Sequence, residues 1–230
     1  MSTVVLIPGA GGIAWYWHRV TPLLDAAGLR CMPVDLPADD DSAGLPHYAD
    51  RVVTTVDDQE DVVLVASSMG AFTAALVATR LPVVAVILVN AMVPIPGETP
   101  GAWWGNTGAE QARAAAAERG GYDPVFDPAS PESATTYFMH DVPADVVAAG
   151  ANHQRRQSQT VFASVCDFQA WPPVPLHVVA GRDDRFFPVD FQQRVARERL
   201  GLDADVLPGG HLIALSHPDE LAHYVITHAP

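Results

Sequence analysis

Cysteine and basic residues are both scarce in this chain of 230 residues. There are two cysteines and 13 basic residues against 27 acidic ones, which gives a formal net charge of −14. Cys31 and Cys166 lie far apart and do not form a spacing typical of a metal site or a redox pair, so we expect two buried, free thiols. The acidic balance disfavours nucleic acid and anionic membranes as partners.

Long hydrophobic runs and a basic leader are missing as well. The longest apolar run, residues 81–96, is interrupted by Pro and Asn and is too short to span a membrane. The N-terminal MSTVVLIPGAGG has no basic stretch before its apolar segment, so it does not fit a signal peptide. We therefore expect a cytoplasmic protein without a membrane partner. The sequence leaves the oligomeric state open.

Motifs for nucleotides and metals are also lacking. The glycine-rich PGAGG at residues 8–12 is not followed by Gly-Lys-Ser/Thr and does not fit the G-x-G-x-x-G frame. The acidic run at residues 39–41 lacks the spacing of a calcium loop. The histidines near the C-terminus, at 217, 223 and 228, are not spaced as an i, i+4 metal pair. We expect neither a cofactor nor a metal.

Short β-branched runs alternate with longer helical patterns through most of the chain. This alternation, with nearly continuous apolar strands, predicts one α/β domain over residues 1–230 with a doubly wound, mostly parallel sheet. The expected strands are residues 3–7, 30–35, 62–66, 83–89, 176–180 and 204–207. The expected helices are residues 16–27, 48–56, 71–80, 189–200 and 218–227.

One interval, approximately residues 92–173, interrupts the alternation. It opens with a Pro- and Gly-rich loop and predicts helices at residues 110–119 and 144–157, but no strand. A long insertion after a parallel strand lies where such folds bind ligands, so we interpret it as a helical lid. Trp103, Trp104 and Phe138 are candidates for contact with substrate, although aromatic side chains also serve as simple packing. Outside the interval, Leu212 is a fourth candidate.

Two adjacent serines stand where an apolar run ends and a helical pattern begins. A strand–turn–helix that presents a nucleophile needs small residues two positions before and after it, usually as G-x-S-x-G. Around Ser68 these are Ala66 and Gly70, whereas around Ser67 they would be a valine and a methionine. The pattern therefore selects Ser68 as the nucleophile; its alternative role is to cap the helix that follows.

A serine nucleophile needs a base and an acid, here in the chain order Ser, Asp or Glu, His. The segment GRDDRFFP follows one expected strand and carries Asp183 and Asp184, and PGGHL follows the next and carries His211. Both segments fall at the edge of the sheet where Ser68 is expected. For most of the other histidines we expect structural or surface roles.

Four segments make the chain resemble the α/β-hydrolase superfamily over nearly its full length: LIPGAGGIAWYWHRVTPLL, LVASSMGAF, GRDDRFFP and GGHLIALSHPDEL. It is most similar to the compact serine esterases related to plant methylesterases and hydroxynitrile lyases. The acid of that superfamily commonly occupies G-x-x-D-x-x-x-P, and Gly181 and Pro188 frame Asp184 in this way. The resemblance thus implies a triad of Ser68, Asp184 and His211.

Acyl transfer also needs two N–H donors for the oxyanion, and the loss of one commonly costs about 3–4 kcal/mol of barrier. The amide after the nucleophile, that of Met69, is one donor. By resemblance, the usual His-Gly-X after the first strand corresponds to Pro8-Gly9-Ala10, so that the amide of Ala10 is the second. The donor is a backbone group, and Pro8 in place of histidine changes only its support.

These residues predict a serine hydrolase acting on a small or medium, largely apolar carboxylic ester, with a small molecule as its partner. In the related lyases a lysine follows the catalytic histidine, whereas this chain has Leu212 there. Dehalogenases and epoxide hydrolases need a carboxylate nucleophile, which Ser68 is not. Hydroxynitrile lyase-like or lactonase activity and a slow-turnover ligand receptor stay as alternatives, because a fold does not fix its chemistry.

Overall fold

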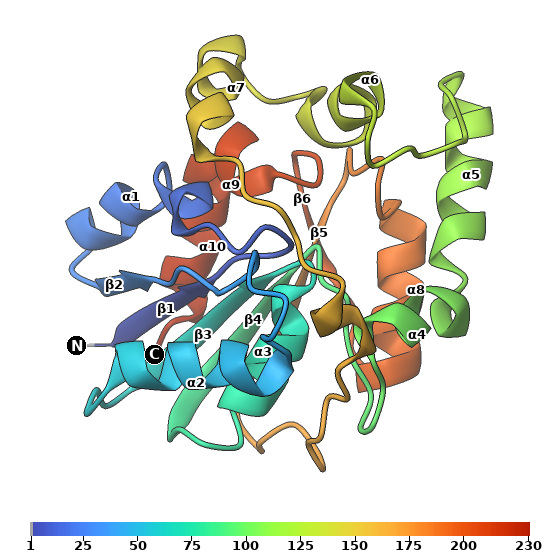
Figure 1. Ribbon diagram of the computed structural model, residues 1–230. Helices are drawn as coiled ribbons and strands as arrows, with labels where there is room; N and C mark the ends of the chain where they lie inside the picture. The colour runs from blue at the N-terminus through green and yellow to red at the C-terminus, as the bar shows by residue number, and fades with distance from the viewer. Residues whose placement is uncertain (1) are drawn as a thin grey trace.

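The computed structural model describes residues 2–230 and contains a sheet of six strands in the order β2-β1-β3-β4-β5-β6 (Figure 1). Every neighbouring pair is parallel. The strands are β1 (Thr3–Ile7), β2 (Arg30–Pro33), β3 (Val62–Ser67), β4 (Val83–Val89), β5 (Leu176–Gly181) and β6 (Asp205–Leu207). The predicted doubly wound α/β sheet is thereby confirmed, with strand ends displaced by at most two residues.

The two faces of the sheet bury alternate residues of the same strands, as the two-residue period of a strand requires. Val5 and Ile7 belong to the core on one face, whereas Val4 and Leu6 belong to the core on the other. The first face is covered by α2 (Leu45–Val56), α3 (Gly70–Val77) and α8 (Val189–Leu200). The second is covered by α1 (Thr21–Ala26), α9 (Ile213–Ser216) and α10 (Pro218–His228).

The predicted helix over residues 16–27 is wrong in its extent. The structure has a 3₁₀ helix at Ala14–Trp17 and then a separate helix, α1, that begins at Thr21. Pro22 lies in the first turn of α1, where a backbone N–H has no acceptor within the helix, so the missing N–H of proline costs no hydrogen bond. A proline deeper in a continuous helix would have removed such a bond, so the chain starts a new helix instead.

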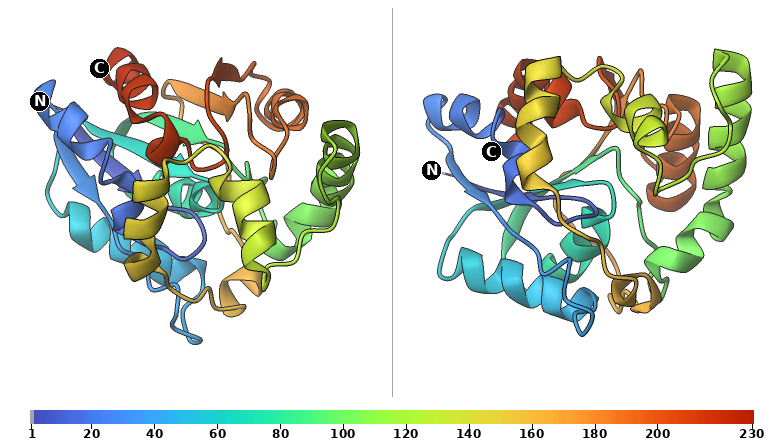
Figure 2. Two further views of the ribbon diagram at one scale, coloured as in Figure 1. Left: turned by 90° about the horizontal axis from the view of Figure 1, so that it is seen from above. Right: turned by 45° about the horizontal axis from the view of Figure 1, so that its top comes forward.

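The segment between β4 and β5 is helical, and no strand interrupts it in the described chain. Its helices are α4 (Pro100–Thr107), α5 (Ala109–Gly120), α6 (Pro131–Ala134), a π-helical turn (Thr135–Met139), α7 (Ala144–Gly150) and two 3₁₀ helices (Ala151–His153 and Thr160–Ala163). The helix predicted over residues 144–157 is shorter in the structure, where α7 and the 3₁₀ helix that follows it end at His153. Figure 2 shows this insertion running from α4 and α5, outside α8, to α6 and α7.

The insertion is attached to the sheet domain by a buried ion pair. Glu98, at its beginning, accepts hydrogen bonds of 2.5 and 3.0 Å from Arg199 in α8. Both side chains are almost fully buried.

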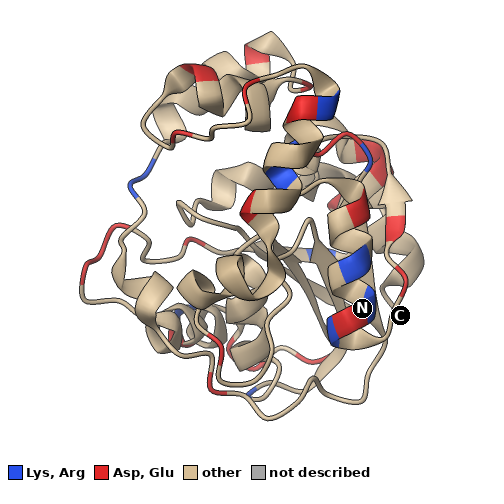
Figure 3. Cartoon of the chain, turned by 90° about the vertical axis from the view of Figure 1, so that its right-hand side faces the viewer, with Lys and Arg blue, Asp and Glu red and all other residues tan. Residues whose placement is uncertain are grey.

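Charged residues of both signs are spread over helices and loops in the view of Figure 3. In that view the negative net charge is therefore not concentrated at one place.

Candidate active site

Ser68 lies in a strained turn between β3 and α3. Its φ of +52° is in the left-handed region, which is uncommon outside glycine. The turn is tight because a Cβ on Gly70 would lie 2.5 Å from the carbonyl oxygen of Pro8, and one on Gly9 would lie 2.9 Å from the Cβ of Ser68. Steric crowding therefore explains why the sequence pattern requires a small residue, here Gly70, two positions after Ser68.

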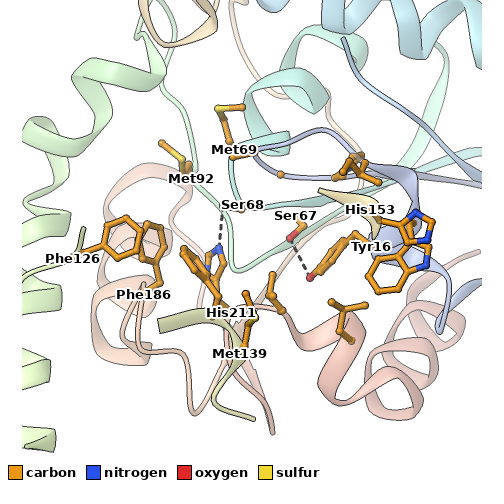
Figure 4. A pocket seen from close by; sticks show the side chains of 18 of the residues that line it. Tyr16, Ser67, Ser68, Met69, Met92, Phe126, Met139, His153, Phe186 and His211 are labelled. Atoms are coloured by element: carbon orange, nitrogen blue, oxygen red, sulfur yellow. Dashed lines mark hydrogen bonds between the residues drawn. The ribbon is translucent and has the colours of Figure 1, made fainter. Parts of the chain in front are cut away.

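The structure brings together Ser68, His211 and Asp184 from three separate loops. The Oγ of Ser68 lies 3.1 Å from Nε2 of His211 (Figure 4). Nδ1 of the same ring lies 2.8 Å from Oδ2 of Asp184. Asp184 and His211 are 5% and 4% exposed, so water competes little for these hydrogen bonds. The arrangement can pass a proton from the serine to the imidazole.

The carboxylate of Asp184 is held in place by several donors. Its Oδ1 accepts from the amides of Phe186 and Phe187, each at 2.8 Å, and its Oδ2 accepts from Nε2 of Gln192 at 3.1 Å. Asp183 lies outside this network and pairs at the surface with Arg182. The two adjacent aspartates thus have different surroundings, and only Asp184 faces the imidazole.

The loop that carries His211 is held from two sides by Asn90 and Asp141, neither of which belongs to a recognisable sequence motif. The buried Asn90, directly after β4, donates to the carbonyl oxygens of Gly210 and His211, both at 3.0 Å. On the other side, Asp141 of the insertion accepts from the amide of Gly210 at 2.6 Å. The insertion and the sheet therefore both position the imidazole.

Two backbone amides near Ser68 are suited to bind an oxyanion. Ala10 and Met69 line the same cavity as Ser68 and His211. In the part of the chain that the structure describes, neither amide donates a hydrogen bond, whereas the next amide in the first loop, that of Gly11, donates to Oε1 of Gln157 at 2.9 Å. Met69, from the position after Ser68, and Ala10, from the family resemblance, are the donors expected above, and their role stays a prediction.

A cavity of about 500 Å³ opens beside Ser68 and His211. Its walls are mainly apolar and come from the loop after β1, the turn after β3, the His211 loop and the insertion. The residues that line it are Pro8, Gly9, Ala10, Ile13, Trp15, Tyr16, Ser67, Ser68, Met69, Met92, Trp104, Phe126, Phe138, Met139, His153, Phe162, Phe186, His211, Leu212 and Leu215. Such a cavity fits a small organic molecule with few polar groups.

Of the aromatic residues predicted to contact substrate, Trp104 and Phe138 line the cavity, as does Leu212. The prediction for Trp103 needs correction. Trp103 is fully buried, does not line the cavity, and donates through Nε1 to the carbonyl oxygen of Val93 at 3.0 Å. Neighbouring residues of a helix point about 100° apart, so one tryptophan packs in the core while the other reaches the cavity.

Within residues 2–230, no three His, Cys, Asp or Glu side chains lie close enough together to hold a metal ion. Among the helices of the same residues, none has the length and apolar character needed to cross a membrane.

Residues 4–224 match the model of a family described as the alpha/beta hydrolase family. The chain belongs to the alpha/beta hydrolase family. A stretch of 123 residues is 32% identical to Methylesterase 3 of Arabidopsis thaliana and covers 48% of this chain and 47% of that relative. The match thus spans about half the length of the relative.

Two solved structures, of an esterase and a hydrolase, share the fold over nearly the whole chain. Polyneuridine aldehyde esterase has a TM-score of 0.79 at 19% identity, with 100% of both chains covered. A pyrethroid hydrolase from Sphingobium faniae JZ-2 has a TM-score of 0.78 at 22% identity, with 99% of this chain and 97% of the other covered. At these identities the likeness concerns the fold alone.

Proposed function

We propose that this chain is a serine hydrolase that cleaves a small or medium, largely apolar carboxylic ester through an acyl-enzyme on Ser68. The observation that carries the proposal is the continuous hydrogen-bonded chain from Ser68 through His211 to Asp184. The same three residue types in this geometry activate a serine in unrelated folds. The similarity to a methylesterase over half the chain supports an ester as the substrate.

In the proposed reaction, the hydroxyl of Ser68 attacks the ester carbonyl while Nε2 of His211 takes its proton. The Nδ1–H of His211 donates to Asp184, which holds the ring in the required tautomer and stabilises the imidazolium. The oxyanion accepts hydrogen bonds from the amides of Ala10 and Met69. His211 then protonates the leaving alcohol, and a water molecule activated by the same imidazole hydrolyses the acyl-enzyme.

The insertion has the role of a lid in this proposal. It contributes Phe126, Phe138, Met139 and Phe162 to the cavity wall, so it shields the ester carbonyl from bulk water. Shielding strengthens the hydrogen bonds to the oxyanion because the local dielectric constant is low. The apolar walls favour apolar acyl and alcohol groups.

The arrangement gives less support to cyanohydrin cleavage. Leu212, next to His211, lines the cavity with an apolar side chain, and the chain has no lysine at any position. A leaving cyanide would therefore find no ammonium group for its negative charge.

Covalent labelling and turnover test the proposal together. Wild-type protein should release p-nitrophenol from a short acyl ester, and a fluorophosphonate should add once, on Ser68. Ser68→Ala should lower kcat by at least about a thousandfold and abolish labelling. Ser42→Ala, in an exposed loop, is the matched control and should behave as wild type. Full turnover by Ser68→Ala would refute the assignment.

A further inference from the structure

Two more hydroxyl groups line the cavity beside Ser68. Ser67, at the end of β3, and Tyr16, in the 3₁₀ helix Ala14–Trp17, both belong to the cavity wall. The Oγ of Ser67 lies 3.4 Å from the Oη of Tyr16. In Figure 4 this pair lies on one side of Ser68 and His211, and Phe126 and Phe186 lie on the other. The cavity therefore has an apolar side, with Phe126 and Phe186, and a side that carries the two hydroxyls and the imidazole of His153.

The two hydroxyls carry two protons, but the hydrogen bond between them engages only one. Two O–H groups meet in one hydrogen bond of 3.4 Å, and no other hydrogen bond within residues 2–230 has either hydroxyl as its donor. The backbone amide of Ala214, next to the Tyr16 oxygen, is a donor as well and so offers no acceptor. One proton is therefore left without an acceptor, whichever of the two oxygens carries it. Burial raises the pKa of Tyr16 to about 12, so its hydroxyl is neutral and protonated at neutral pH.

The surroundings of the pair limit what could accept this proton. Ile13, Leu212 and Leu215 contribute apolar wall to the cavity. A donor in apolar surroundings is costly unless a ligand supplies an acceptor. No Arg, Lys, Asp or Glu is among the residues that line the cavity. The lining side chains that can become cationic are His153 and His211, and His211 is paired with Ser68 and Asp184. An anionic acceptor would therefore lose its hydration without gaining an Arg or Lys partner, which favours an uncharged oxygen.

We propose that the hydroxyl pair of Tyr16 and Ser67 binds an uncharged acceptor oxygen of the substrate. The substrate class is then an ester with an apolar group toward Phe126 and Phe186 and a ketone, ether or alcohol oxygen toward Tyr16. This inference rests on the proposed function, because it takes Ser68 as the site of ester cleavage. A few placed polar groups in an apolar cavity fix the orientation of a ligand in this way.

Matched esters test the inference. The parent compounds are methyl esters of phenylalkanoic acids, and each analogue replaces one CH₂ of the acyl chain by a ketone. A second series places the ketone in the alcohol. Wild type should prefer at least one ketone ester over its parent by about tenfold in kcat/KM, the size of one buried hydrogen bond. Tyr16→Phe should remove that preference, because it should lower kcat/KM for the ketone ester about tenfold more than for its parent.

A control variant separates the lost hydroxyl from a general effect of the substitution. Tyr224 makes its hydrogen bond to Asp205 and does not line the cavity. Tyr224→Phe should therefore keep the wild-type ratio of ketone to parent ester. Ser67→Ala should lower the ratio, because the partner that orients Tyr16 is gone. Melting temperatures of all variants show whether each is folded.

Binding to Ser68→Ala provides a readout that does not depend on turnover. Calorimetry should give a Kd for the preferred ketone ester about tenfold lower than for its parent, and adding Tyr16→Phe should make the two equal. Equal losses for ketone and parent esters in Tyr16→Phe, or equal affinities in Ser68→Ala, would overturn the inference. Absence of ester turnover by wild type, with selective binding intact, would instead overturn the proposed function.

Discussion

The side-chain amide of Asn90 donates a 3.0 Å hydrogen bond to the carbonyl oxygen of His211. The same amide nitrogen donates to Gly210, and the Oδ1 of Asn90 accepts from the amide of Gly181 at 2.7 Å. Asn90 is completely buried and has a φ of +46°. One side chain therefore joins the ends of β4 and β5 to the loop that carries the imidazole.

Asn90→Ala should impair both stability and turnover. It leaves buried backbone groups without partners, and we expect the free energy of unfolding to fall by about 2–3 kcal/mol. Because His211 loses an anchor, kcat for the ester should fall by about tenfold while KM changes little. Denaturant unfolding and steady-state kinetics measure the two effects.

Asn90→Gly distinguishes the hydrogen bonds from backbone strain. Glycine adopts positive φ without cost but supplies no amide group. Its kcat should therefore be as low as that of Asn90→Ala, although its stability should be somewhat higher. Wild-type kcat in Asn90→Gly would show that the hydrogen bonds do not position His211.

The fold, and the convergence of the candidate residues Ser68 and His211, could be predicted because their signals are local. β1 and β4 have the predicted bounds, since an apolar strand buried on both faces is a continuous run in the sequence. Ser68 and His211 follow strands, and parallel strands bring their carboxyl ends to one edge. The choice of Asp184 over Asp183 rests on the spacing G-x-x-D-x-x-x-P, which only the family resemblance supplies.

Other residues of the site could not be predicted because their roles depend on contacts between distant segments. Asn90 acts on Gly210 and His211, which are 120 and 121 positions away. Tyr16 lies 51 positions from Ser67. Trp103 and Trp104 are equivalent in the sequence, and only the orientation of α4 decides which one reaches the cavity.

Gly9→Ala should lower turnover because of steric conflict at the nucleophile. The added Cβ would lie 2.9 Å from the Cβ of Ser68 and 3.3 Å from the carbonyl oxygen of Ser67, so the turn must shift. Misplacement of a reacting group by about 1 Å can cost about a hundredfold in rate, and we expect kcat to fall by at least tenfold. Steady-state kinetics with a p-nitrophenyl ester measures this.

Gly105→Ala is the matched control for that substitution. A Cβ at Gly105 meets no atom within 4 Å, and the residue lies inside α4. Its kcat should equal that of wild type, and its stability should stay the same or rise by up to about 1 kcal/mol. If Gly9→Ala kept wild-type kcat, the close approach of the first loop to Ser68 would not matter for the reaction.

Glu98→Ala should weaken the attachment of the insertion to α8. The substitution leaves Arg199 buried without its partner, and such a loss typically costs about 3–5 kcal/mol. The double variant with Arg199→Met should be less destabilised than Glu98→Ala alone, because the orphaned charge is gone. A double-mutant cycle by denaturant unfolding measures the coupling, and additive effects of the two substitutions would contradict a buried ion pair.

The buried thiol of Cys166 should make stability depend on alkaline pH. Burial raises its pKa to about 12, whereas an unfolded cysteine has a pKa of about 8.5. Below pH ~8.5 the thiol is protonated in both states and its contribution to stability is fully present. As the pH rises toward 12, the unfolded chain loses a proton that the folded chain retains, and stability falls by up to about 1.4 kcal/mol per pH unit.

Cys166→Ala isolates this contribution. The substitution lowers stability at neutral pH because it leaves a cavity, so the informative quantity is the slope against pH. Between about pH 8.5 and 9.5 the free energy of unfolding should fall less steeply with pH in the variant than in wild type. The difference between the two slopes corresponds to less than one proton and grows with pH. Cys31 has a pKa raised to about 12 by burial as well, and it accounts for part of the slope that persists. Parallel slopes for wild type and Cys166→Ala would mean that the folded protein ionises this thiol as readily as the unfolded chain does.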